Sequence, residues 1–135
     1  MKFNNRKKIF FIVEIGINHN GDIKIAKEMI KEAKFSGADA VKFQKRDIDL
    51  VYDKETLSSK RESPWGDTFR HQKEGIEFGL KEYKQIDEYC RSLDIEWFAS
   101  AWDLNSLDFL KQFKLKYTKI ASPMIIDKKF LEEVA

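Results

Sequence analysis

The segment that decides the fold reads IFFIVEIG at residues 9–16, NHNGD at 18–22 and ADAVKFQ at 38–44. The first run is continuously apolar, which predicts a strand over 9–15 that is covered on both faces. NHNGD is typical of a turn that supplies a helix cap, and apolar residues then recur at helical spacing until Gly37, a natural helix end. The interval from Glu14 to Lys42 is that of a right-handed βαβ unit, so the segment predicts parallel strands.

The same alternation of strands and helices continues along the chain. We expect helices at about 81–93, after a cap at Asn105 and after a cap at Asp127, and strands at 95–100 and 117–122. Residues 45–80 show no sustained period and contain Pro64, which predicts a long, structureless insertion between a strand and a helix. Its aromatic residues Trp65 and Phe69, with His71, either close over a pocket or pin the insertion to the scaffold. The order of elements is that of a parallel barrel or a doubly wound sheet.

The length selects between these architectures. A closed (β/α)8 barrel takes roughly 250 residues, whereas this chain has 135 and four predicted strands. We therefore expect an α/β fold that forms the N-terminal half of a (β/α)8 TIM barrel, with about four βα units in one partial domain over 1–135. Such a half, taken alone, would expose strand edges and half of a core.

The composition excludes several classes of function. Lys and Arg number 25 and Asp and Glu number 23, and they are mixed along the chain, which does not indicate nucleic-acid binding. No apolar stretch approaches the roughly 18 residues that span a bilayer, and Glu14 interrupts the first apolar run too early for a signal peptide. Cys90 is the single cysteine and cannot form an internal disulfide, so we expect a reduced, cytoplasmic setting. It lies on a helical apolar stripe, which predicts a buried thiol.

Polar residues able to do chemistry stand at the ends of all four predicted strands: Glu14, Lys42, Gln44, Ser100, Lys119 and Ser122. The carboxyl ends of parallel strands meet at one mouth, where such folds bind ligands. Desolvation there would raise the pKa of the Glu14 carboxyl towards values useful for proton transfer, although a structural pair with Lys42 also explains this acid. Each lysine in an apolar strand needs an anion, either an internal carboxylate or a shared, phosphorylated ligand. His19 could bind a metal or substrate or be structural, and no metal-binding set with recognisable spacing is present.

Three strand-end motifs read EIGINHNG at 14–21, VKFQ at 41–44 and KIAS at 119–122. In that order they resemble the sialic acid synthase (N-acetylneuraminate synthase) family, whose relatives make legionaminic and pseudaminic acids. The resemblance runs from about Ile9 to the last residue and includes WGDT at 65–68. It implies a (β/α)8 barrel that condenses phosphoenolpyruvate with the open-chain aldehyde of an N-acyl hexosamine, such as N-acetylmannosamine. The products would be phosphate and a nine-carbon 2-keto acid.

The resemblance also implies roles for single residues. Lys42 and Ser100 would bind the carboxylate end of phosphoenolpyruvate, and Lys119 and Ser122 its phosphate. Glu14 would serve in proton transfer. Gln44 would contact the sugar.

Two departures from the family pattern affect substrate detail. The chain reads ASAWD at 99–103 where many members read STPFD, so that Ser100 keeps a hydroxyl and Trp102 keeps an aromatic wall at the substrate. Ala121 stands where many members have glycine. Asn18 and His19 are further possible site residues.

The complete enzyme, by this resemblance, uses a divalent metal, Mn²⁺ or Mg²⁺, to polarise the aldehyde oxygen. Two metal-binding histidines on later strands, and an antifreeze-like C-terminal domain that supplies an arginine to the partner's sugar site, are not in this chain. The resemblance implies a domain-swapped homodimer for the complete enzyme.

Three alternatives remain. Another phosphoenolpyruvate-dependent barrel synthase would join the donor to a sugar phosphate, and it needs a phosphate-binding set that is commonly rich in arginine. The arginines here, Arg46, Arg61, Arg70 and Arg91, show no such cluster in the sequence. A Schiff-base aldolase would use Lys42 or Lys119, and a non-catalytic remnant would keep only affinity for anions.

Overall fold

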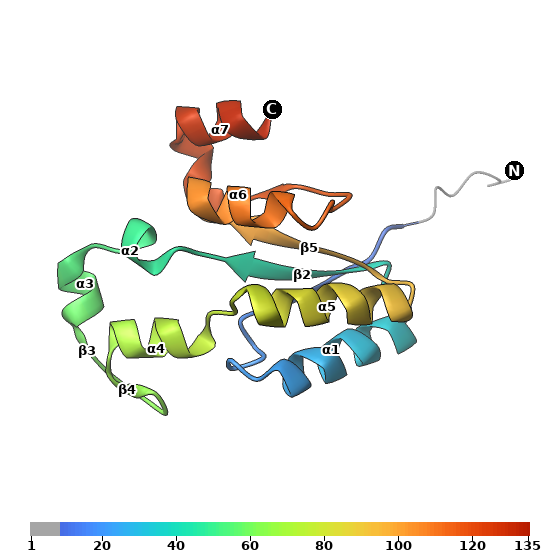
Figure 1. The fold of residues 1–135 in the computed structure, drawn as a ribbon, viewed down its shortest axis with the longest axis horizontal. Helices are drawn as coiled ribbons and strands as arrows, with labels where there is room; N and C mark the ends of the chain where they lie inside the picture. The colour runs from blue at the N-terminus through green and yellow to red at the C-terminus, as the bar shows by residue number, and fades with distance from the viewer. Residues whose placement is uncertain (1–8) are drawn as a thin grey trace, which may run out of the picture.

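The structure of the protein is a computed structural model that describes residues 9–135; residues 1–8 of the predicted domain lie outside this range. Its main sheet contains β1 (Ile12–Gly16), β2 (Ala40–Lys45), β5 (Glu96–Ala101) and β6 (Lys119–Ile120). The strands are parallel and lie in the order β1-β2-β5-β6. They therefore follow one another in space as they do in the chain, as the strands of a (β/α)8 barrel do (Figure 1).

Three of the four helices of the βα units begin after an aspartate whose side chain caps them, and the fourth, α5, begins after Gly79. They are α1 (Ile23–Phe35), α5 (Leu80–Ser92), α6 (Leu104–Lys111) and α7 (Lys128–Val134), and a 3₁₀ helix, η1 (Ser122–Ile126), precedes α7. Asp127 caps α7 as predicted, by accepting a hydrogen bond from the Phe130 amide. The prediction that Asn105 caps α6 is wrong, because Asp103 accepts from the Ser106 amide at 2.7 Å and the helix starts at the next residue.

The core lies between one face of the sheet and the helices. Side chains alternate along a strand, so Val41 and Phe43 of β2 and Trp97 of β5 point to this face. There they meet Tyr83 and Ile86 of α5, and all five side chains are buried. Figure 1 shows α1 and α5 side by side along the sheet.

Cys90 of α5 lies within this core, as predicted. Burial raises the pKa of its thiol to about 12, and the charge of Asp87 contributes to the rise. The thiol is therefore protonated at neutral pH and unreactive.

The opposite face of the sheet is open along β1, whereas Phe98 and Ser100 of β5, on the same face, are each only 4% exposed. The prediction that the first strand is covered on both faces is wrong, because Ile12 is 48% exposed while Ile15, on the helix side, is fully buried. Within the described residues β1 pairs only with β2 and stands at an edge of the sheet. The expectation that the half-barrel exposes an edge and part of a core is confirmed.

The insertion between β2 and α5 has structure of its own. It contains α2 (Ile48–Val51), α3 (Lys54–Ser58), β3 (Lys60–Ser63), β4 (Gly66–Thr68) and α4 (Phe69–Ile76). The prediction of a structureless segment over 45–80 is wrong, because Asp47, Asp53 and Thr68 cap three short helices. These helices have no long apolar period, so the sequence pattern alone did not indicate them.

The aromatic residues of the insertion hold it together. A Cβ added to Gly75 would lie 2.1 Å from the Trp65 Cγ, so the indole lies directly on this glycine. Phe69 packs edge to face on Tyr52 with ring centres 5.1 Å apart. Of the two possibilities, the contacts favour pinning the insertion over closing a pocket. Among residues 9–135 no helix is long and apolar enough to cross a membrane.

Candidate functional site

The strand register brings five of the predicted site residues together on the open face. Glu14 pairs in register with Lys42, Gln44 pairs with Ser100, and Ser100 pairs with Lys119. Neighbouring strands lie about 4.8 Å apart, so these side chains form two adjacent rows near the carboxyl ends. Since the alternate residues of β2 are those that enter the core, Lys42 and Gln44 point away from the helices.

Lys42 is the centre of this arrangement. It forms an ion pair with the Glu14 carboxylate and is largely buried. Burial lowers the pKa of Lys42, and the positive charge of Lys119 lowers it further. The two ammonium groups therefore repel each other across β5, and an anion bound between them would relieve that repulsion.

Glu14 is less buried than the sequence predicted. Its side chain is 47% exposed, because the open face of β1 has no cover within the described residues. The desolvation expected for this carboxylate is therefore not provided by the strands described here. What the structure does provide is a cationic partner, Lys42.

Gly16 is a site residue that the sequence reasoning missed. Its φ of 56° lies in the left-handed region, and the register of β1 shifts between Glu14 and Gly16. A Cβ at this position would lie 3.0 Å from Glu14 Oε1 and 3.4 Å from Gln44 Nε2. The absence of a side chain thus lets the carboxylate and the amide converge on one point. A glycine directly after the strand-end acid was the available signal.

Lys119 and Ser122 stand at the end of β6, which is shorter than the predicted strand over 117–122. Pro123 has no amide hydrogen for a sheet ladder, and η1 begins beside it. Lys119 is exposed and its ammonium donates to the Ile120 carbonyl at 2.5 Å, and Ser122 is exposed. The register places Lys119 on the open face, and both side chains are accessible to solvent.

Trp102 follows β5 and lies beside the insertion. The guanidinium carbon of Arg46 lies 5.5 Å from the centre of its ring. A cleft of ≈ 570 Å³ runs past Trp102, and Tyr52 of the insertion and Met124 of η1 also line it. The predicted aromatic wall therefore stands next to an open volume.

Asn18 and His19 lie apart from the two rows. His19 is only 3% exposed, stacks on Phe78 at 3.9 Å and accepts a hydrogen bond from the Gly21 amide at 3.1 Å. Burial, and then the charge of Arg46, lower the pKa of His19 to about 4, so it is neutral at pH 7. These contacts favour the structural interpretation of His19. Asn18 is exposed in the turn.

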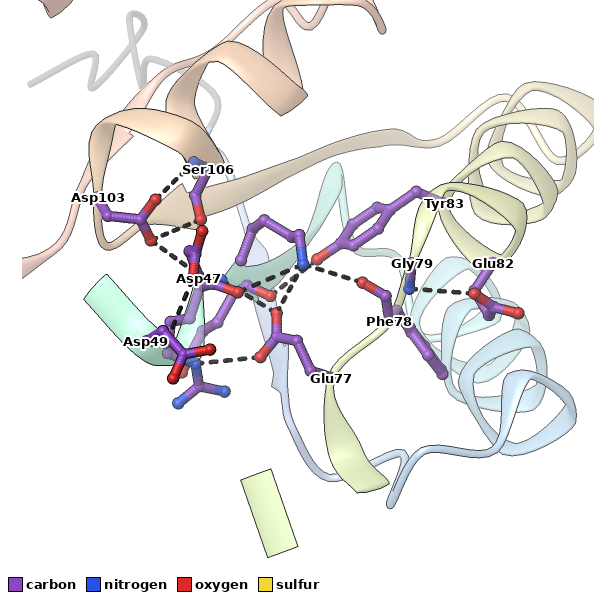
Figure 2. Close-up of polar contacts among 12 residues, drawn as sticks. Asp47, Asp49, Glu77, Phe78, Gly79, Glu82, Tyr83, Asp103 and Ser106 are labelled. Atoms are coloured by element: carbon purple, nitrogen blue, oxygen red, sulfur yellow. Dashed lines mark hydrogen bonds and ion pairs between the residues drawn. The ribbon is translucent and has the colours of Figure 1, made fainter. Parts of the chain in front are cut away.

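A buried polar network fixes the insertion to the strand ends (Figure 2). Glu77 accepts from the Arg46 amide at 3.0 Å, from Arg46 Nε at 3.2 Å and from Lys45 Nζ at 3.3 Å. Asp103 accepts from the Asp47 amide at 2.8 Å and from the Ser106 hydroxyl at 2.7 Å. The sequence reasoning missed this network, since its partners are far apart in the chain.

Tyr83 reaches the site from the core. Its hydroxyl donates to the main-chain carbonyl of Gln44 at 2.8 Å. This bond fixes the end of β2 from the helix side; Figure 2 shows Tyr83 extending from its helix towards the network. The Gln44 side chain lies on the open face because of the alternation along β2.

Residues 9–135 contain no group of three or more His, Cys, Asp or Glu side chains that could hold a metal ion. The donors described here therefore do not fit the divalent metal that the resemblance implies.

Comparison with known proteins adds an independent line of evidence. The sequence matches the NeuB family over residues 29–135. An N-acetylneuraminate-9-phosphate synthase of Drosophila melanogaster is 38% identical over 116 residues, which cover 84% of this chain and 31% of that protein. An N,N'-diacetyllegionaminic acid synthase of Legionella pneumophila is 36% identical over 129 residues, which cover 93% of this chain and 36% of that protein.

The chain thus spans about a third of the length of these curated relatives. Among solved structures, the N-acetylneuraminic acid (sialic acid) synthetase of Leptospira borgpetersenii superposes with a TM-score of 0.79 at 28% identity. The superposition covers 99% of this chain and 45% of that one. The predicted fold, an α/β part of a TIM barrel, is confirmed.

Proposed function

The chain belongs to the NeuB family, and from this premise we propose that it forms part of an enzyme that condenses phosphoenolpyruvate with an N-acyl hexosamine. N-acetylmannosamine is the simplest such acceptor. The reaction joins C3 of phosphoenolpyruvate to the aldehyde carbon of the open-chain sugar, and a water molecule consumed in the reaction allows phosphate to leave and C2 to become the keto group. The observation that carries the proposal is the pair of neighbouring lysines on the open face, Lys42 and Lys119, which suit a small, multiply charged anion.

We assign roles to these residues as the resemblance implies. Lys42 and Ser100 would receive the carboxylate of phosphoenolpyruvate, and Lys119 and Ser122 its phosphate. A donor carboxylate at Lys42 would take the place of Glu14 in the ion pair. Glu14 would then be released to transfer the proton that the aldehyde oxygen needs when it becomes a hydroxyl.

Gln44 would orient the sugar. Its amide nitrogen lies next to the Glu14 carboxylate over Gly16. A hydroxyl group of the acceptor bound there would place the aldehyde near the acid. Trp102 would form one wall of the acceptor site.

The relatives differ in the product that their names give. Some are named as N-acetylneuraminate-9-phosphate synthases, and others as synthases of diacetyllegionaminic acid or pseudaminic acid. Phosphoenolpyruvate supplies three carbons, so a 9-phosphate on the product comes from a 6-phosphate on the hexosamine. The proposed acceptor therefore includes hexosamines with and without this phosphate.

A divalent metal, Mn²⁺ or Mg²⁺, belongs to the proposal only as a group held by residues outside this chain. No step above depends on it. The homodimer of the complete enzyme is likewise a proposal, and no step depends on it.

A Schiff-base aldolase is the second candidate, because a lysine with a lowered pKa, as in Lys42, is a suitable amine nucleophile. Borohydride treatment in the presence of pyruvate would trap its imine and increase the protein mass. The synthase forms no imine and would not be modified.

The direct test is an assay of the protein at its full encoded length. It should release phosphate only when phosphoenolpyruvate and the hexosamine are both present, and mass spectrometry should detect the nine-carbon 2-keto acid. Phosphate release that does not require the sugar would contradict the proposal, as would binding of the donor without any turnover.

A further inference from the structure

The cleft of ≈ 570 Å³ beside the strand ends has a largely apolar lining. The lining includes Leu50, Val51 and Tyr52 of the insertion, Trp102 after β5, and Met124 and Ile126 of η1. Leu50 is 59% exposed and Ile126 is 89% exposed, so apolar surface of the cleft is uncovered within the described part of the chain. The volume is many times the about 30 Å³ that a water molecule occupies in the liquid. A side group of a substrate therefore has room inside.

The two charged residues in this lining are acids that already have partners. Asp103 is buried and accepts hydrogen bonds from the Asp47 amide and the Ser106 hydroxyl. Asp127 caps α7 by accepting from the Phe130 amide. No lysine or arginine is among the described residues that line the cleft. The cleft is therefore unsuited to a phosphate or a carboxylate and suited to an uncharged group with an apolar end.

Tyr52 supplies a polar group within this apolar lining. Its hydroxyl accepts a hydrogen bond from Arg46 Nη1 at 3.4 Å, and its own proton has no acceptor among residues 9–135. Donation from a charged guanidinium polarises the hydroxyl and strengthens it as a donor. Tyr52 can therefore donate to a carbonyl oxygen of a group that enters the cleft.

The cleft borders the residues that we propose for phosphoenolpyruvate binding. Trp102 is two residues after Ser100, and Pro123, which also lines the cleft, directly follows Ser122. In the proposed reaction phosphoenolpyruvate attacks the aldehyde carbon of the hexosamine, and the N-acyl group is attached to the next carbon of the sugar. A hexosamine in position to react therefore holds its N-acyl group close to the donor, at the border of the cleft.

We infer that the cleft is the site for the N-acyl group of the acceptor and that it takes acyl chains longer than acetyl. The carbonyl oxygen of the acyl group accepts a hydrogen bond from the Tyr52 hydroxyl, and the chain packs on Leu50, Met124 and Ile126. Each added methylene covers apolar surface that is otherwise exposed to water, which strengthens binding. This inference rests on the proposed function and deepens it, because it assigns the residues that select the acyl group.

The test compares acceptors that differ only in the acyl group of the mannosamine: N-acetyl, N-propanoyl, N-butanoyl and N-glycolyl. The N-glycolyl group has a hydroxyl where N-propanoyl has a methyl, so this pair compares polarity at nearly equal size. The protein is used at its full encoded length with saturating phosphoenolpyruvate. The variants are Ile126→Ser and Tyr52→Phe. Ile125→Ser is the matched control, because Ile125 is an exposed neighbour on η1 that does not line the cleft.

We expect kcat/KM to rise by about 2- to 4-fold with each added methylene, as for a methylene that becomes partly or fully buried. N-propanoylmannosamine should exceed its N-glycolyl counterpart by at least about 5-fold, because the glycolyl hydroxyl loses water in the cleft. Ile126→Ser should lower the ratio of kcat/KM for N-butanoyl over N-acetyl by at least about 3-fold, whereas Ile125→Ser should keep the wild-type ratio.

Tyr52→Phe should raise the KM for all four acceptors by about 3- to 10-fold, because each of them has the same amide carbonyl. The ring and its packing on Phe69 are retained in this variant, so the melting temperature should stay as in wild type. The KM for phosphoenolpyruvate should also stay unchanged.

The failures are distinguishable. No product from any of the four acceptors would overturn the proposed function and this inference with it. Turnover of N-acetylmannosamine with equal or lower kcat/KM for the longer chains would overturn the inference alone. Equal changes in Ile126→Ser and Ile125→Ser would do the same, as would a Tyr52→Phe protein with the wild-type KM for the acceptors.

Discussion

Glu14 is half exposed in its pair with Lys42, and pairs this exposed contribute little to stability. Its removal should therefore affect the reaction more than the fold. We expect Glu14→Gln to leave the affinity for phosphoenolpyruvate near wild type and to lower kcat by about 10²- to 10⁴-fold, as for loss of a general acid or base. Glu96→Gln, at the other end of the same face, is the control. Normal phosphate release by Glu14→Gln would remove this residue from proton transfer.

His19 should make stability depend on pH. In the folded protein its pKa is lowered to about 4, against 6.5 for a free histidine, so only the unfolded chain takes up a proton between these values. The free energy of unfolding should therefore contain the whole contribution of His19 above about pH 6.5 and lose it as the pH drops towards 4. Urea unfolding of wild type and His19→Asn across this range measures the effect. The free energy of unfolding of His19→Asn should depend less on pH than that of wild type in this range. The same pH dependence in both proteins would contradict the account.

The sequence predicted the open-face residues better than the rest of the site. Alternation along a strand is enough to place Lys42 and Gln44 on one face, and the carboxyl ends of parallel strands bring Ser100 and Lys119 beside them. Gly16 was missed because its role depends on a backbone angle that the pattern does not specify. The Arg46 to Glu77 contact was missed because it joins residues at the two ends of an insertion without periodicity.

The insertion depends on Glu77, whose side chain is 10% exposed between two cations. Removal of its charge leaves Lys45 and Arg46 buried without a counter-charge. We expect Glu77→Gln to lower the free energy of unfolding by about 3 kcal/mol and to increase protease cleavage within residues 46–79. Chemical denaturation and limited proteolysis measure both effects.

Glu74→Gln is the matched control, because Glu74 lies on α4, three residues before Glu77, but is exposed, in its pair with Arg70. It should change stability by less than about 0.5 kcal/mol. Equal effects of the two substitutions would show that the buried network does not hold the insertion.

Elements with a clear period were predicted within a few residues, and elements without one were not. The strand that became β2 and the helix that became α5 follow the alternation and the 3.6-residue spacing of their apolar residues. The insertion has only caps and turns, whose effect depends on which segments pack together. The last strand was predicted too long because Pro123 and η1 shorten β6.

The open face determines how the 135-residue chain should behave on its own. Phe10, which precedes β1, and Ile12 of β1 are partly exposed where a further strand or another chain would pack. We expect this chain to bind an apolar fluorescent dye and to self-associate as its concentration rises. Phe10→Lys should reduce both effects, whereas Phe35→Lys, at the exposed end of α1, should change them little. A monomer that binds no dye would contradict this account of the face.

The measurement that tests the central claim most directly is calorimetric titration of phosphoenolpyruvate into the full-length protein and into Lys119→Ala. Lys116→Ala is the control, because Lys116 is an exposed neighbour whose partner is Glu96, away from the strand ends. We predict that Lys119→Ala weakens binding by about 10- to 100-fold without loss of the fold, since it removes a charge-assisted bond to the phosphate, and that Lys116→Ala binds as wild type. Unchanged affinity in Lys119→Ala would contradict the assignment of the open face as the donor site.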